Sequence, residues 1–171
     1  MTTLVMTVPH SGTNFLCSFL TAHLGLDGRD YLMGPGASAD FCRTHPHKST
    51  EINVEDYDAV IITLRHPLRT VETHKRYSKI DDASIQFIED SWRALMDEAM
   101  KAKKIIYLVI DGPEENRLPQ LQAIANHFGK GHMTDVIEQY AADWRPLNSS
   151  VTDANERAMQ FAIEAYEKWQ Q

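Results

Sequence analysis

The stretch of sequence that decides the fold is LVMTVPHSGTNF, residues 4–15. Its first five residues form a short, nearly continuous apolar run, which is typical of a strand buried on both faces of a parallel sheet. A tight turn rich in small residues follows, and then apolar residues at helical spacing. A helix that begins at such a turn points its backbone N–H groups and the positive end of its dipole at one spot, which favours a bound phosphate.

The turn after this strand contains Ser11, Gly12 and Thr13. The two hydroxyls can donate to a phosphate, and glycine permits a close approach of the backbone that a side chain would block. The alternative is that the three residues only cap a helix, and the motif alone does not decide between the two. The Walker A pattern is absent, which disfavours an ordinary ATPase or GTPase.

Two further apolar runs, at residues 59–64 and 105–110, predict strands of the same kind. Segments with helical spacing alternate with the runs, at residues 15–20, 85–99 and 118–128, and a last helix is expected from a cap at Thr152 or Asp153. This alternation predicts an α/β fold with three layers, α/β/α, around a central, mostly parallel sheet. We expect one domain over residues 1–171, because a chain of 171 residues with 43% hydrophobic content suits one core.

The composition limits the partners that the chain can have. A net charge of -7 argues against a general binder of nucleic acid or of a membrane surface, since both need a basic field. No stretch reaches the roughly 20 apolar residues of a membrane span, and the first residues lack a secretory pattern. Only two cysteines occur, so we expect reduced thiols and a cytoplasmic protein.

The turn also resembles the 5′-phosphosulfate loop of the sulfotransferase family, which has the form Pro-Lys/Arg-Ser-Gly-Thr-Thr-Trp. Four positions match this form, namely Pro9, Ser11, Gly12 and Thr13, and three depart from it, namely His10, Asn14 and Phe15. The departure at His10 has the largest chemical consequence, because a neutral imidazole stabilises a departing phosphate less than a fixed cation does.

Two other segments resemble the same family in the same order along the chain. Arg65, at the end of the second apolar run, and Thr73 are similar to the arginine and the serine eight positions later that hold the nucleotide's 3′-phosphate. The segment Phe41-Cys42-Arg43-Thr44-His45-Pro46 is similar to the family's Lys-Thr-His segment, with Arg43 in place of the lysine. Residues 105–129, residues 142–148 and the helix with Asn155-Glu156 are also similar to parts of the family. Its Arg-Lys-Gly motif is not evident; Lys130-Gly131 is the nearest fragment of it, and Arg145 is the nearest cation.

The resemblance implies the P-loop NTPase-like sulfotransferase fold and 3′-phosphoadenosine-5′-phosphosulfate (PAPS) as co-substrate, with no metal. It implies that His45 is the general base and that Arg43 and His10 stabilise charge at the moving sulfuryl group. Nucleotide contacts would come from Ser11, Gly12, Thr13, Asn14 and Phe15 in the loop, with Phe15 against adenine, and from Arg65 and Thr73 at the 3′-phosphate. The acceptor would be a hydroxyl or an amine.

Other interpretations remain open at this point. A non-catalytic nucleotide-binding module with the same fold is favoured by the changed loop lysine and disfavoured by Arg43-Thr44-His45. A P-loop kinase-like phosphotransferase is disfavoured by the missing Walker lysine. We rank a metal site low, because the eight histidines lack carboxylates or cysteines at ligand spacing. The acceptor is not identified, and its pocket is either open or completed by a second subunit in a homo-oligomer.

Overall fold

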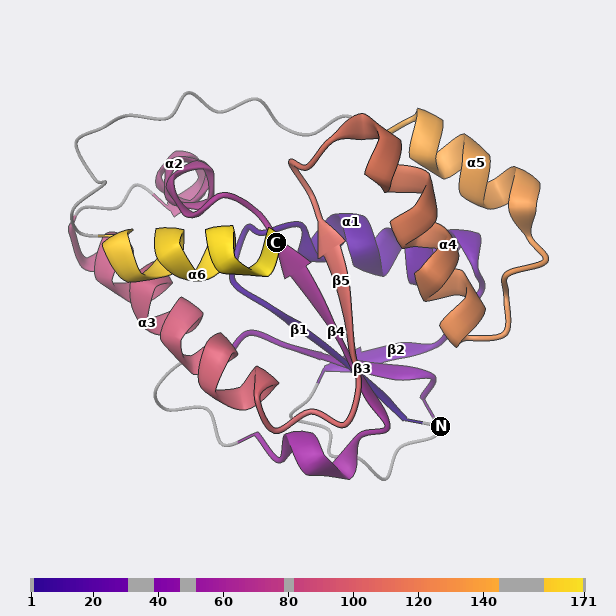
Figure 1. Cartoon of the computed structure of the whole chain (residues 1–171), viewed down its shortest axis with the longest axis horizontal. Helices are drawn as coiled ribbons and strands as arrows, with labels where there is room; N and C mark the ends of the chain where they lie inside the picture. Colours follow the sequence, from indigo (N-terminus) through magenta and orange to yellow (C-terminus); the bar gives the residue numbers. More distant parts are fainter. Residues whose placement is uncertain (1, 31–38, 47–51, 79–81, 145–158, 171) are drawn as a thin grey trace.

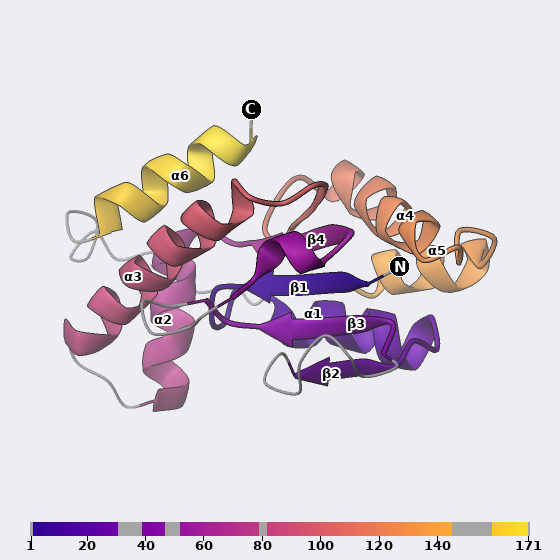
Figure 2. The same cartoon turned by 90° about the horizontal axis from the view of Figure 1, so that it is seen from below.

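The computed structural model describes residues 2–30, 39–46, 52–78, 82–144 and 159–170. Five strands form one sheet in the order β2-β3-β1-β4-β5, and every neighbouring pair is parallel. The strands are β1 (Thr3–Thr7), β2 (Gly28–Asp30), β3 (Phe41–Thr44), β4 (Ala59–Leu64) and β5 (Ile105–Val109). Figure 1 shows the arrangement of the elements. The first strand along the chain is the middle strand of the sheet, and Figure 2 shows β1 between β4 and β3.

Helices follow β1, β4 and β5 and cover both faces of the sheet. The α-helices in the described ranges are α1 (Thr13–Ser18), α2 (Pro67–Ser78), α3 (Asp82–Ala99), α4 (Arg117–His127), α5 (Thr134–Ala142) and α6 (Gln160–Gln170). A π-helical segment, η1 (Phe19–His23), continues α1, and short 3₁₀ turns lie at η3 (Val54–Asp56) and η4 (Glu114–Asn116). None of the helices in these ranges is long and apolar enough to cross a membrane.

The alternation of side chains along β1 and β4 divides the core into two halves. Leu4 and Met6 of β1 pack with residues of α2, α3 and α6, whereas Val5 packs with residues of α1, η1, α4 and α5. Successive side chains of a strand point to opposite faces, so a strand in the middle of three layers must be apolar throughout. The two helical layers lie on opposite sides of the sheet in Figure 2.

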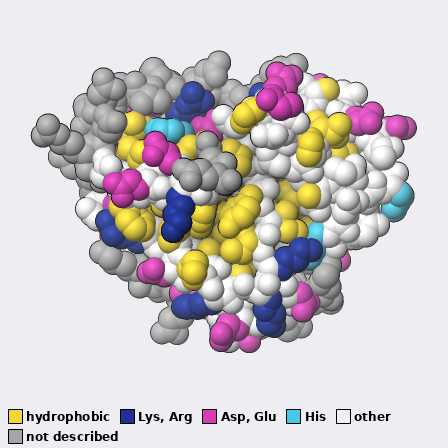
Figure 3. Space-filling model, viewed as in Figure 1, with side chains coloured by type: hydrophobic (Ala, Val, Ile, Leu, Met, Phe, Trp, Pro, Cys, Tyr) yellow, Lys and Arg dark blue, Asp and Glu magenta, His cyan; other side chains and the backbone are white. Residues whose placement is uncertain are grey.

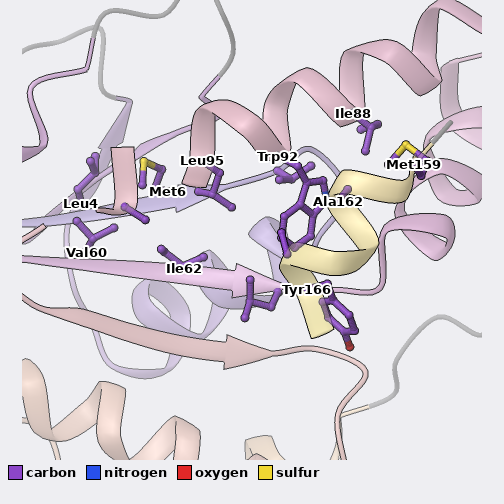
Figure 4. Packing of buried hydrophobic residues seen from close by; sticks show 14 of the residues in the cluster. Leu4, Met6, Val60, Ile62, Ile88, Trp92, Leu95, Met159, Ala162 and Tyr166 are labelled. Atoms are coloured by element: carbon purple, nitrogen blue, oxygen red, sulfur yellow. The ribbon is translucent and has the colours of Figure 1, made fainter. Parts of the chain in front are cut away.

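The layer made by α3 and α6 is centred on Trp92, which is fully buried. Met159, Ala162 and Tyr166 of the last segment pack on it together with Ile88 and Leu95 of α3 (Figure 4). The carboxylate of Glu89 accepts a hydrogen bond from the backbone N–H of Ala162 at 3.2 Å, so a side chain of α3 satisfies one of the free donors at the start of α6.

Strand β5 lies at one edge of the sheet, and its Ile105, Ile106, Tyr107 and Val109 are only partly buried. Figure 3 shows hydrophobic side chains grouped at the centre of that view, where β5 comes to the surface. The backbone N–H of Val109 donates to the Oε1 atom of Gln120 at 2.6 Å, so a side chain of α4 covers one of the edge donors.

The predicted α/β class is confirmed, and so is the parallel sheet. The three apolar runs are β1, β4 and β5, each within one residue of the predicted bounds. β2 and α5 have no counterpart in the sequence prediction, which also placed no strand at residues 41–44. The loop expected at residues 34–39 falls outside the described residues except for Ala39, and so do the caps expected at Thr152 or Asp153.

The topology directs attention to the carboxyl ends of β1 and β4. These strands are neighbours, yet the helix after β1 packs on one face and the helices after β4 pack on the other. The two chain segments therefore diverge at this edge, and in open α/β sheets such a switch point is where ligands bind.

Candidate functional site

The turn that leaves β1 has an unusual backbone. His10 has a φ of 62° and Gly12 a φ of 110°, both in the region that L side chains rarely adopt. A Cβ atom added to Gly12 would lie 2.4 Å from Cγ1 of Ile110, so packing as well as backbone conformation requires glycine there. A non-glycine residue held at such a φ costs free energy and persists where the surroundings fix it.

The hydroxyl of Ser11 ties this turn to the neighbouring strand. Ser11 is fully buried, and its Oγ donates to the carbonyl oxygen of Val8 at 2.7 Å. Oγ also lies 2.8 Å from Oγ1 of Thr63 in β4. Because the single proton of Ser11 goes to Val8, Thr63 is the donor in the second bond. In this conformation Ser11 holds the shape of the turn.

The start of α1 offers backbone donors beside this turn. Gly12 is the N-cap and supplies no side-chain cap, and the first turn contains no acidic residue. The N–H groups at the start of a helix have no partner within the helix. They and the positive end of the dipole point outward from residues 13–15, where the sequence predicts the phosphate contacts of Thr13 and Asn14.

Arg65 and Thr73, predicted as a pair from the sequence, meet beside the turn. The Nη1 atom of Arg65 donates to Oγ1 of Thr73 at 2.8 Å and to the carbonyl oxygen of His10 at 3.2 Å. The two residues are 3% and 5% exposed, and Thr73 passes its own proton to the carbonyl oxygen of Arg69 at 2.9 Å. A buried guanidinium therefore contacts the strained residue of the turn and places positive charge there.

His45 follows β3 and is tied to the end of β1. Its Nδ1 atom lies 2.8 Å from the carbonyl oxygen of Thr7 and 3.0 Å from Oγ1 of the same residue. A carbonyl oxygen can only accept, so Nδ1 carries the proton and Nε2 is left with the lone pair. Oγ1 of Thr7 lies 2.7 Å from Oγ1 of Thr13, which links His45 to the start of α1.

His10 lies among several nitrogen-bearing side chains. Its ring centroid is 4.8 Å from that of His74 in α2. Burial lowers the pKa of His10 below its ordinary value, and the charges of His74, His45 and Arg65 lower it further. The ligand-free protein therefore holds His10 mostly neutral near pH 7, and only a bound anion would favour the charged form.

The other predicted site residues in the described ranges are Phe15, Asn14 and Arg43. Phe15 is partly buried, with its ring 4.4 Å from the Trp144 ring and 4.8 Å from the Tyr140 ring. Asn14 is exposed in the first turn of α1. Arg43 is exposed in β3, where it is in register with Val5 of β1, and therefore lies on the strand rather than in the turn after it.

Four residues of the site were not predicted from the sequence, namely Thr7, Thr63, Asp111 and Tyr166. Thr7 and Thr63 are in register at the ends of β1 and β4 and are fully buried. A threonine next to the last residue of each of the first two apolar runs was the available signal, because a buried hydroxyl needs a partner. The partners of Asp111 and Tyr166 are distant in sequence, so no local pattern indicated them.

Part of the predicted site falls outside the described residues, including Arg145 and the segment with Asn155-Glu156. Within the described ranges, histidine, cysteine and carboxylate side chains form no group of three or more that could hold a metal ion. Neither a family model nor a curated protein matches this sequence.

Proposed function

We propose that this protein is a PAPS-dependent sulfotransferase with the P-loop NTPase-like sulfotransferase fold, acting on an acceptor hydroxyl or amine. The observation that carries the proposal is the contact between Arg65 and Thr73 at 2.8 Å, beside a turn with the sequence PHSGTNF. A guanidinium and a hydroxyl eight residues apart are what the resemblance requires for a 3′-phosphate, and they lie at the sheet's switch point.

The residues present fit such a nucleotide. The backbone N–H groups at the start of α1 would receive the 5′-phosphate, with Ser11 and Gly12 holding the turn in shape. Arg65 would supply charge-assisted hydrogen bonds to the 3′-phosphate. Phe15, which packs against Tyr140 and Trp144, would contact adenine.

When bound, the nucleotide would supply the activated sulfuryl group. Nε2 of His45 would take the acceptor's proton as the new bond to sulfur forms, while the bond from sulfur to the 5′-phosphate oxygen breaks and that phosphate leaves with its electron pair. The hydrogen bond from Nδ1 to Thr7 fixes the ring and its tautomer for this role. Arg43 and a protonated His10 would stabilise charge around the moving sulfuryl group.

The first experiment is a calorimetric titration with adenosine 3′,5′-bisphosphate, with adenosine 5′-monophosphate as the matched ligand lacking the 3′-phosphate. We expect Arg65→Ala to weaken the bisphosphate far more than the monophosphate, because each lost charge-assisted bond costs roughly 1.5–3 kcal/mol. Thr73→Val, which keeps the side-chain volume, should do the same to a smaller degree. Absence of bisphosphate binding at millimolar ligand would overturn the proposal.

A second candidate is a non-catalytic nucleotide-binding module, which the lowered pKa of His10 favours because the turn then lacks a fixed cation. Transfer separates the two candidates. Sulfuryl transfer from p-nitrophenyl sulfate to the bisphosphate releases p-nitrophenolate, which is coloured. We expect His45→Ala to bind the bisphosphate normally and to lose about 10²–10⁴ in this rate. Normal binding without transfer in the unmodified protein would favour the module.

A further inference from the structure

A second hydrogen-bond network holds the backbone on both sides of Arg65. Asp111 follows β5, and its carboxylate accepts the backbone N–H of His66 at 3.0 Å through Oδ2 and at 3.3 Å through Oδ1. Just before it, the N–H of Ile110 donates to the carbonyl oxygen of Leu64 at 2.7 Å. The chain is therefore held on both sides of Arg65, by a backbone bond at residue 64 and by a carboxylate at residue 66.

The last helix reaches the same carboxylate. The hydroxyl of Tyr166 in α6 donates to Oδ1 of Asp111 at 2.7 Å, and its ring lies edge-on to the ring of His66 at 5.4 Å. Figure 4 shows the Tyr166 ring below α6, with its hydroxyl oxygen pointing away from the other labelled residues. The ring itself is buried against Trp92, so the hydroxyl cannot move far.

The buried carboxylate of Asp111 is surrounded by hydrogen-bond donors. Its side chain is 3% exposed, and besides the peptide N–H and the phenol it has the guanidinium of Arg69 at 3.8 Å. The side chain of Arg69 is 36% exposed and its guanidinium lies near the distance limit of an ion pair, so solvent screens its attraction to the carboxylate. The buried hydrogen bonds to His66 and Tyr166 are therefore the contacts that fix the carboxylate.

We infer that Asp111 and Tyr166 are positioning residues that fix Arg65 for the 3′-phosphate of the nucleotide; this rests on the proposed function. Neither touches the ligand. Arg65 reaches Thr73 and the His10 carbonyl from a chain whose direction at residue 66 is set by Asp111. A bidentate grip on phosphate depends on the direction of the guanidinium, so a small shift of that peptide weakens it.

The test compares Tyr166→Phe and Asp111→Ala with two matched variants. Tyr107→Phe makes the same chemical change on β5, and Asp111→Asn keeps an oxygen that can accept from the His66 N–H. We measure the ratio of the affinities for adenosine 3′,5′-bisphosphate and 5′-monophosphate, and the NMR signal of the Arg65 guanidinium in the ligand-free protein. Tyr166→Phe should lower the ratio about fivefold and Asp111→Ala about tenfold. Both should shift the Arg65 signal, Asp111→Asn should restore much of the ratio, and Tyr107→Phe should change neither.

The outcomes separate this inference from the proposed function. If both nucleotides weaken equally while the Arg65 signal stays in place, the two residues only stabilise the fold and the inference is wrong. If the unmodified protein binds no bisphosphate, the proposed function fails. In that case an unchanged Arg65 signal in Tyr166→Phe shows that Tyr166 does not position Arg65 either. A shifted signal supports the positioning of Arg65, with an anion other than the bisphosphate as its ligand.

Discussion

The hydrogen bond between Ser11 and Thr63 gives a quantitative test of how the turn after β1 is held. Ser11→Ala removes the donor to Val8 and the acceptor for Thr63. Val8 keeps a second donor, the N–H of residue 11 at 3.1 Å, but the Thr63 hydroxyl is fully buried and has no route to water. Leaving a buried hydroxyl without its partner costs about 1–3 kcal/mol.

The matching change on the strand has a smaller cost. Thr63→Val exchanges the hydroxyl for a methyl group of similar size, and Ser11 still donates to Val8, so we expect a loss of about 0.5–1.5 kcal/mol. The double variant leaves no unpaired hydroxyl. The loss in the free energy of unfolding of the double variant should therefore be close to the loss in one of the single variants. It should be about 1 kcal/mol smaller than the sum of the two single losses, which is the coupling between the two residues.

Urea unfolding followed by tryptophan fluorescence measures these differences for the unmodified protein and the three variants. Additivity of the two single changes within about 0.3–0.5 kcal/mol would refute the coupling. A loss below about 0.5 kcal/mol for Ser11→Ala would refute the burial argument as well. The same variants, titrated with the bisphosphate, report whether the shape of the turn matters for the anion.

Three other predictions follow from the structure. Gly12→Ala should cost about 2–4 kcal/mol in urea unfolding, since it combines a positive φ with a clash against Ile110. Made in an Ile110→Ala protein, the same change should cost only the part due to backbone conformation, and a Gly12→Ala protein as stable as the unmodified one would contradict the geometry. Burial raises the pKa of Glu89 above its ordinary 4.5, so the protonated carboxyl group is favoured more in the folded than in the unfolded state. The contribution of this group to the free energy of unfolding is therefore fully present below pH 4.5 and is lost as the pH rises through the folded pKa. Glu89→Gln should flatten the stability profile in that window, and an unchanged profile would rule out Glu89 as its source. The pKa of His10 is lowered in the free protein and a bound anion would raise it, so near pH 6–7 bisphosphate binding should take up as much as one proton more in the unmodified protein than in His10→Lys, whose side chain is charged throughout. Calorimetry in buffers of different ionisation enthalpy counts that proton, and the same count in both proteins would show that His10 is not its acceptor.

The sequence predicts those parts of the fold that are apolar throughout. β1, β4 and β5 lie between helical layers or against them, and their residues had to be hydrophobic on both faces. β2 is three residues long, Gly28–Asp30, at an edge, and it carries no apolar pattern that could predict it. The strand order does not follow from any local pattern, because it depends on which helices cover which face.

The candidate site was predictable where its residues are close in sequence. The turn at residues 9–13 was predicted from its position between a strand and a helix, and Arg65 with Thr73 from a resemblance. The contacts of Ser11 with Thr63, of His45 with Thr7 and of Asp111 with Tyr166 join residues 52, 38 and 55 positions apart. Such pairs depend on the register of neighbouring strands and on the packing of α6, and local sequence patterns carry no information on either.

The residues of the candidate site come from the ends of three different strands, with Thr7 as the last residue of β1, His45 directly after β3 and Arg65 directly after β4. The turn, the imidazole and the guanidinium come together only when β1 lies between β3 and β4, so no isolated fragment of the chain can form the site. A ligand bound there is therefore linked to the folding of the whole sheet. At a concentration 100 times its dissociation constant, a ligand that binds only the folded state adds about 2.7 kcal/mol to the free energy of unfolding. The melting temperature of the protein thus reports how much ligand is bound at the carboxyl ends of the strands. Ligands can be ranked by their effect on it before any acceptor has been found.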